Sequence, residues 1–139
     1  MNQNLIYYPC LALILYTFAI LAWMFRTRVK AIKDGKVDYR HFKTYSTDCK
    51  VPHEVLQIER NFSNLLEVPP IFYIICAFTL MTKQVDQVQL VLSWGYVFLR
   101  LIHSLVHITS NKLQYRVLFY GGSWIVLVVM AIRLGVSLY

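Results

Sequence analysis

Four apolar stretches, each close to the length of one membrane span, constrain the fold of this chain more than any other feature. About 20 helical residues are needed to cross the roughly 30 Å hydrocarbon core of a bilayer. The chain has 139 residues, of which 58% are hydrophobic, so little of it is left for a separate soluble domain. The apolar stretches cover 5–25, 65–81, 88–108 and 118–139. We therefore predict an all-α integral membrane protein that folds as a four-transmembrane-helix bundle.

A single four-helix transmembrane domain is predicted to span the whole chain, 1–139. Its helices are expected at about 5–29, 53–82, 87–109 and 113–138. Pro69 and Pro70 interrupt the second helix. Because a proline lacks the backbone donor and clashes with the carbonyl four residues earlier, we expect a bend beside Glu67.

The segment between the first two helices is the only sizeable part predicted to lie outside the membrane. Asp34–Gly35 is a turn signal, and the polar run 46–48 (Ser-Thr-Asp) precedes Pro52. This pattern favours a helix that starts near His53. The cysteines are an odd set without paired spacing, so we predict neither a disulfide framework nor a metal site. They are Cys10, Cys49 and Cys76.

Lysine and arginine are distributed unequally between the two ends of the predicted bundle. The turn between the third and fourth helices holds Lys112, whereas the connection on the opposite side holds only Lys83. By the positive-inside rule, the basic loops should be cytoplasmic and both termini on the opposite side. The net charge of +7 then reflects topology and not nucleic-acid binding, and anionic lipid headgroups are a second interpretation. The first loop carries Arg26, Arg28, Lys30, Lys33, Lys36, Arg40, Lys43 and Lys50.

Polar and charged side chains within the apolar stretches are the main functional signal. Each ionised group at the centre of a bilayer costs roughly 2.5–3.5 kcal/mol, so these groups should meet one another or a ligand. Within each helix they are spaced by three, four or seven residues, which places them on one stripe. Antiparallel topology brings the stripes to the same level, near the cytoplasmic face. The set consists of Arg60, Asn64 and Glu67 on the second helix, Arg100, His103 and His107 on the third, and Arg116 and Tyr120 on the fourth.

A purely structural role is the alternative for part of this set. Glu67 could pair with Arg60 or Arg100 and hold two helices together, and His103 could be a core histidine bonded to a neighbour. The other leaflet is expected to hold little comparable polarity, since Arg133 lies near the end of the last helix and can reach the interface.

The run 59–69 (ERNFSNLLEVP), followed by RLIH at 100–103 and by Arg116, resembles the MAPEG family, the membrane-associated proteins in eicosanoid and glutathione metabolism. The likeness covers nearly the whole chain, and its nearest types are the microsomal glutathione transferases and prostaglandin E synthases. It implies a homotrimer that binds glutathione between neighbouring subunits near the cytoplasmic face. It also implies a lipophilic small-molecule substrate that enters from the membrane.

The resemblance also implies roles for single residues. Arg116 matches the arginine that stabilises the glutathione thiolate, and a guanidinium that is always charged suits that task. The residues that match glutathione contacts or line the same pocket are Asn64, Glu67, His103, Tyr120, Arg60 and Arg100. His107 stands where prostaglandin E synthase-like members have a tyrosine, and it could still donate a hydrogen bond.

Other positions depart from the prostaglandin E synthase-like pattern. Those members have arginine in place of Ser63, serine in place of Val117 and arginine in place of Asp38. The loss of two candidate carboxylate anchors leaves open a different thiol or anionic ligand. Our leading hypothesis is a glutathione-dependent transferase or peroxidase acting on lipophilic electrophiles or hydroperoxides. The alternative is a non-enzymatic bundle that binds membrane lipid or a protein partner on the same scaffold.

Overall fold

The structure is a computed structural model that describes residues 1–44 and 50–138. The polar run 46–48, Cys49 and Tyr139 lie outside these ranges. All regular elements in the described part are helical, and four spans are long and apolar enough to cross a membrane. The predicted all-α four-helix bundle is therefore confirmed. The elements are η1 (Gln3–Ile6), α1 (Tyr7–Lys33), α2 (His41–Thr44), α3 (His53–Glu67), α4 (Pro69–Met81), α5 (Gln87–Ile108) and α6 (Leu113–Ser137).

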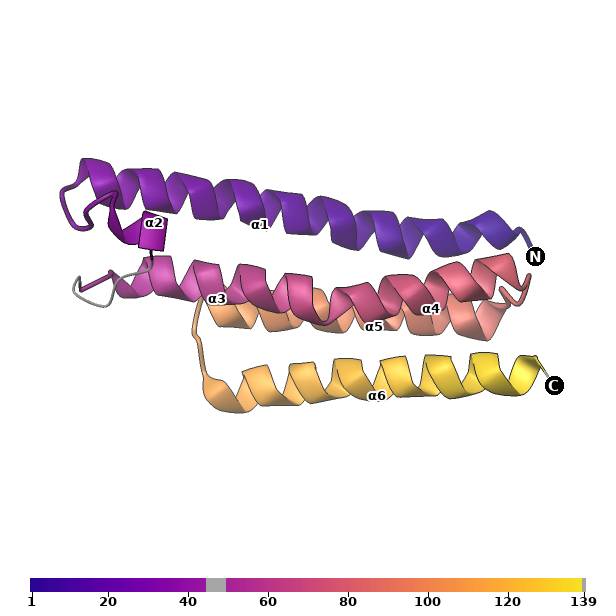
Figure 1. The fold of residues 1–139 in the computed structure, drawn as a ribbon. Helices are drawn as coiled ribbons and strands as arrows, with labels where there is room; N and C mark the ends of the chain where they lie inside the picture. Colours follow the sequence, from indigo (N-terminus) through magenta and orange to yellow (C-terminus); the bar gives the residue numbers. More distant parts are fainter. Residues whose placement is uncertain (45–49, 139) are drawn as a thin grey trace.

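The long helices run alternately up and down, so the two ends of the bundle differ (Figure 1). One end, which we call the basic end, holds the connection from α1 to α3 and the turn from α5 to α6. The other end, which we call the terminal end, holds both termini and the turn from α4 to α5. At the basic end α3 and α6 begin and α5 ends. The charged and polar residues predicted on these three helices therefore lie in the half of the bundle near the basic end.

The second span is divided at Val68, between α3 and α4. Pro69 and Pro70 occupy the first positions of α4, where a missing backbone N–H is tolerated. The expected bend beside Glu67 is confirmed. After Pro9, the next proline or glycine in the chain is Gly35, which adopts a φ of +67°. Helix α1 therefore continues to Lys33, beyond the expected end near residue 29.

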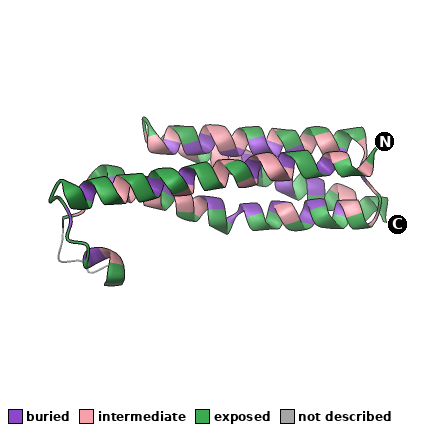
Figure 2. Ribbon diagram, turned by 90° about the horizontal axis from the view of Figure 1, so that it is seen from above, coloured by how far each residue is buried: buried purple, intermediate pink, exposed green. Residues whose placement is uncertain are grey.

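The bundle core is formed where α5 packs against α1, α3 and α6. Fully buried side chains include Leu13 of α1, Phe72 of α4 and Leu127 of α6. The ring of Phe72 stacks on that of Tyr96, with centroids 4.4 Å apart. Exposed residues lie along the outward faces of the helices (Figure 2), and many of them are large and apolar, as a lipid environment favours.

The half of the bundle near the terminal end also contains buried polar side chains. Gln89, Ser93 and Thr79 are each at most 2% exposed. The expectation of little polarity in this half was based on its charged residue, Arg133, alone. It was wrong for uncharged groups. Arg133 itself forms an ion pair with Asp86, at the start of α5.

Candidate functional site

A small pocket lies where α3, α5 and α6 meet, toward the basic end. Its volume is about 220 Å³. The pocket collects four of the eight site residues expected from the sequence, with one or two contributed by each of the three helices. It is lined by Asn64, His103, Leu113, Arg116, Val117 and Tyr120.

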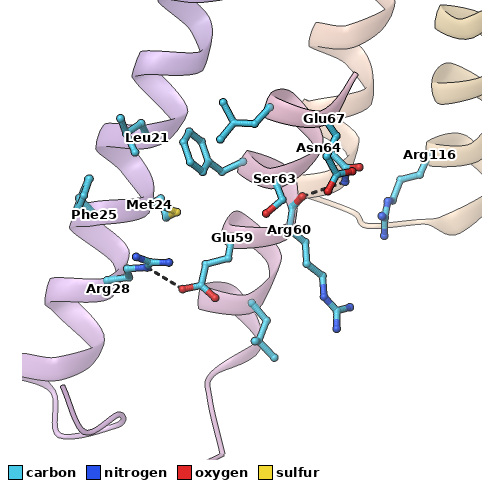
Figure 3. Close-up of a pocket in the computed structure, with 13 residues that line it drawn as sticks. Leu21, Met24, Phe25, Arg28, Glu59, Arg60, Ser63, Asn64, Glu67 and Arg116 are labelled. Carbon is cyan, nitrogen blue, oxygen red and sulfur yellow. Dashed lines mark hydrogen bonds and ion pairs between the residues drawn. The ribbon is translucent and has the colours of Figure 1, made fainter. Parts of the chain in front are cut away.

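A larger groove of about 790 Å³ runs between α1 and α3 and reaches Arg116 of α6. Figure 3 shows Arg28 on the α1 side of α3 and Arg116 on the opposite side. Asn64 and Arg116 line both the small pocket and the groove, so the two hollows share a wall. The groove is lined by Leu21, Met24, Phe25 and Arg28 of α1, Leu56, Glu59, Arg60, Phe62, Ser63, Asn64, Leu66 and Glu67 of α3, and Arg116.

Arg100 lies behind the small pocket and is completely buried. Its Nη2 donates to the backbone carbonyl of Asn64 at 2.6 Å, and its guanidinium lies 5.6 Å from the centre of the Tyr120 ring. Its Nε and Nη1 have no hydrogen-bond partner. Since a buried cation in a membrane normally has a counter-charge, this guanidinium is incompletely satisfied.

His103 joins α5 to α6 by a hydrogen bond. Its Nδ1 lies 3.0 Å from the backbone carbonyl of Arg116. A carbonyl can only accept, so Nδ1 carries the hydrogen and the neutral ring has its lone pair on Nε2. That Nε2 is buried and unpartnered, and the ring lies 5.5 Å from Tyr120. His103 therefore forms the hydrogen bond to a neighbour that a structural role requires, while its Nε2 remains available to a ligand.

His107 lies one turn further along α5 and lines neither hollow. It is 1% exposed, and both of its ring nitrogens lack a partner. Its backbone carbonyl accepts a hydrogen bond from Nε2 of Gln57 at 2.6 Å. The structure brings its ring within 6.0 Å of His103 but does not bring it to the shared wall.

The ion pairs considered for Glu67 do not form. Glu67 is exposed on α3, and among the described residues it pairs with neither Arg60 nor Arg100. The ion pair in this region instead joins Nε of Arg28 to Oε1 of Glu59 at 2.8 Å. Within one subunit, Glu67 therefore forms neither of the ion pairs that this structural interpretation requires.

A buried hydrogen-bond network that the sequence analysis missed lies beside the site. Ser104 of α5 accepts from Nδ2 of Asn61 at 2.7 Å and from the hydroxyl of Tyr16 at 2.8 Å. It thereby joins α1, α3 and α5. The signal was present, since Asn61 and Ser104 are polar residues in apolar surroundings that adjoin the predicted stripes.

The model of the MAPEG family matches residues 6–136, nearly the whole chain. The chain belongs to the MAPEG family. The resemblance inferred from the sequence is thus confirmed, and the chain is a multi-pass integral membrane protein of this glutathione and eicosanoid metabolism family. No curated protein and no solved structure matches the chain.

The groove of this MAPEG bundle has a mixed charge pattern. Arg28, Arg60 and Arg116 contribute three cations, and Glu59 and Glu67 contribute two carboxylates. Apolar side chains line the rest of the groove, including Phe25, which is 55% exposed on the outside of the bundle. The arrangement suits a small ligand with several charges beside an apolar molecule that comes from the lipid.

Proposed function

We propose that this protein is a glutathione-dependent membrane transferase or peroxidase acting on lipophilic electrophiles or hydroperoxides. One observation carries the proposal. Arg100, His103 and Arg116 keep buried nitrogens without partners around the wall that the small pocket and the groove share. Unsatisfied buried donors cost about 1–3 kcal/mol each, and more when charged, so a bound anionic ligand would stabilise the two arginines. The lone pair on Nε2 of His103 would instead accept from an N–H of the same ligand.

The charges of glutathione fit this wall. The tripeptide has two carboxylates, one ammonium group and one thiol. We assign Arg60 and Arg100 to the carboxylates, Glu67 to the ammonium group and Arg116 to the thiolate. Asn64, His103 and Tyr120 would supply further contacts at the same wall. Arg100 and His107 line neither hollow, but Arg100 donates to the carbonyl of Asn64, which lines both, whereas the hydrogen bond of His107 is to Gln57, so we leave His107 outside this assignment.

Arg116 is the residue that we propose to be catalytic. Its Nη1 donates to Oδ1 of Asn111 at 2.9 Å, which leaves the buried Nε free to face a ligand. A fixed cation in a site of low dielectric favours the thiolate over the thiol. The thiolate would attack an electrophilic carbon to form a thioether as the leaving group departs. With a hydroperoxide it would attack the terminal oxygen and break the O–O bond, which releases an alcohol after protonation and leaves a sulfenic acid on glutathione, and a second glutathione would then form the disulfide and water.

A neighbouring subunit would complete the site. Arg60, Ser63 and Glu67 are exposed on one stripe of α3, within a span that is long and apolar enough to cross a membrane. Charged groups left in hydrocarbon are costly, so we propose that a second copy covers them in a homotrimer. We also propose that the basic end is cytoplasmic, as the distribution of lysine and arginine predicts.

The test compares glutathione binding and turnover in three reconstituted proteins. Arg116→Leu should lower the rate of conjugation of a generic electrophile by about 100-fold and remove the ultraviolet absorbance of the bound thiolate. Arg133→Leu is the matched control, because it removes an arginine from the same helix at the other end. Equal rates and equal thiolate signals in the two variants would refute the role of Arg116.

A second candidate function rests on the residues that depart from the glutathione-binding pattern. Val117 puts an apolar side chain into the small pocket, and Ser63 puts a short hydroxyl into the groove. These departures favour a bundle that binds lipid or a protein partner without catalysis. That function predicts that millimolar glutathione leaves the thermal stability unchanged while anionic lipid raises it, whereas the leading proposal predicts a rise with glutathione.

A further inference from the structure

A separate groove lies on another face of α1, toward the basic end. Its volume is about 660 Å³, and it shares no lining residue with the candidate glutathione site. It extends from the apolar middle of α1 to the charged last turns, where the first turn of α3 closes it. The groove is lined by Ala19, Ala22, Trp23, Arg26, Thr27, Lys30 and Glu54.

The charged side chains of this groove form no ion pairs with residues 1–44 or 50–138. Arg26, Lys30 and Glu54 are exposed, and none of them forms an ion pair in the described part of the chain. Arg26 and Lys30 are four residues apart, which places both on one face of α1. The two cations also line an adjoining hollow of about 420 Å³ that contains Lys33. Two cations and one carboxylate therefore face the same space.

The apolar part of the groove is shaped by small residues next to an indole. Ala19 and Ala22 are exposed and leave a shallow channel beside Trp23, which is 50% exposed. Tryptophan is enriched where the headgroups of a bilayer meet the hydrocarbon. An acyl chain can therefore lie along the alanines while its headgroup reaches the charges one to two turns further on.

We propose that this groove binds a phosphatidylserine molecule, with its phosphate and carboxylate at Arg26 and Lys30 and its ammonium group at Glu54. The three charges of this headgroup complement the three charges of the groove. Phosphatidylglycerol has no ammonium group for Glu54, and phosphatidylethanolamine has one anionic group for two cations. Anionic lipids face the cytoplasm, which is the side predicted for the basic end.

A helix-stabilising role is the other interpretation of Glu54. An acidic residue in the first turn of a helix interacts favourably with the positive end of the helix dipole. That role requires no lipid and gives no preference between anionic headgroups. The preference for phosphatidylserine over phosphatidylglycerol therefore separates the two interpretations.

The experiment measures lipids bound to the purified full-length protein by native mass spectrometry, with phosphatidylserine, phosphatidylglycerol, phosphatidylethanolamine and phosphatidylcholine in separate titrations. The wild-type protein should bind phosphatidylserine most tightly. Arg26→Gln with Lys30→Gln should weaken phosphatidylserine binding by about 30-fold, since each cation near an anionic headgroup contributes roughly a factor of five. This variant should also bind phosphatidylglycerol more weakly, because the phosphate of either lipid loses its partners.

Two further variants distinguish recognition of the phosphatidylserine headgroup from a general attraction between positive charge and anionic lipid. Glu54→Gln should bind phosphatidylglycerol as tightly as phosphatidylserine, because the partner of the ammonium group is gone. Lys43→Gln with Lys112→Gln removes the same charge from the basic end outside the groove, and the preference should persist. Equal binding of both anionic lipids to the wild-type protein, or the same loss of preference in this control, would overturn the proposal.

Discussion

The two halves of the bundle use their buried polar groups differently. Among the described residues, nine buried side-chain atoms lack a hydrogen-bond partner, and seven of them belong to the half near the basic end. These seven are carried by Asn61, Arg100, His103, His107 and Arg116. The half near the terminal end has two, on Gln89 and Tyr96. The concentration of unsatisfied charged and imidazole nitrogens in one half supports the proposal that this half holds the binding site.

Polar groups near the terminal end instead connect one element to another. The side chain of Gln3 accepts from the backbone N–H of Val85 at 3.0 Å and donates to the carbonyl of Val85. Nε2 of Gln89 donates to the hydroxyl of Thr79 at 3.3 Å. These contacts join η1 to the turn before α5, and α4 to α5. The same helix, α5, therefore has a packing role in one half and a proposed binding role in the other.

Arg100→Met should have the largest effect on the difference between the two halves of the bundle. The glutathione affinity should fall by about 30- to 100-fold, because hydrogen bonds to a charged group contribute roughly 1.5–3 kcal/mol. The ligand-free protein should be no less stable, since the change removes a buried cation that has no counter-charge. Calorimetric titration and thermal unfolding check the two parts. A large loss of stability with unchanged affinity would assign Arg100 to packing.

Ser104→Ala tests the hydrogen bonds that hold helices together in the half near the basic end. The change strands the buried donors of Asn61 and Tyr16, which join α1 and α3 to α5. The free energy of unfolding should fall by about 2 kcal/mol, and activity at saturating glutathione should persist. Ser93→Ala is the matched control on α5, because its hydroxyl donates to the carbonyl of Gln89, one turn earlier, and its contact with another helix is a long one, 4.0 Å to Sγ of Cys76. A Ser93→Ala loss as large as that of Ser104→Ala would contradict this interpretation.

Local chemistry explains which parts of the fold were predictable. The four spans follow from length and hydrophobicity, and the break at Val68 follows from the missing donors of Pro69 and Pro70. The spacing of polar residues along each helix also predicts that Asn64, His103, Arg116 and Tyr120 converge. These features depend on one helix at a time or on antiparallel order.

The rotation of each helix about its axis was not predictable, because it depends on how neighbouring side chains pack. Glu67 therefore faces outward and not toward Arg100, and Arg28 pairs with Glu59. Gln89, Ser93 and Tyr96 precede Arg100 by eleven, seven and four residues, so they continue its buried stripe. That continuation was visible in the spacing, but uncharged residues give a weaker signal than charges in an apolar stretch.

Gln89→Leu probes the terminal half and should have a smaller effect. The substitution removes the hydrogen bonds of Nε2 to the hydroxyl of Thr79 and, at 3.5 Å, to the carbonyl of Met130, and it also removes one unsatisfied oxygen, so these contributions nearly cancel. The free energy of unfolding should change by less than about 1 kcal/mol, and glutathione affinity should be unchanged. Chemical unfolding in detergent and the same calorimetric titration measure both quantities. A fall in glutathione affinity as large as that of Arg100→Met would break the distinction between the halves.

The smallest effect is expected at Asp86, in the turn before α5. A hydrogen bond from the backbone N–H of Gln89, and then the guanidinium of Arg133, hold the pKa of this carboxyl below its ordinary value. A lowered pKa in the folded state adds stability at neutral pH, which is lost as the pH falls below about 4 and through the folded value. The side chains of Asp86 and Arg133 are 48% and 41% exposed, so their ion pair should contribute less than about 1 kcal/mol to the free energy of unfolding.

Two substitutions separate the partners of Asp86. Asp86→Asn keeps an acceptor for the N–H of Gln89 but loses the ion pair, so the acid-dependent part of the stability should disappear while the helix start is retained. Asp86→Ala loses both interactions and should be less stable than Asp86→Asn at every pH. Thermal unfolding from pH 6 to pH 3 gives the comparison. If wild type and Asp86→Asn lost stability in parallel on acidification, the carboxyl would have no part in joining α5 to α6, and the terminal half would depend on its uncharged contacts alone.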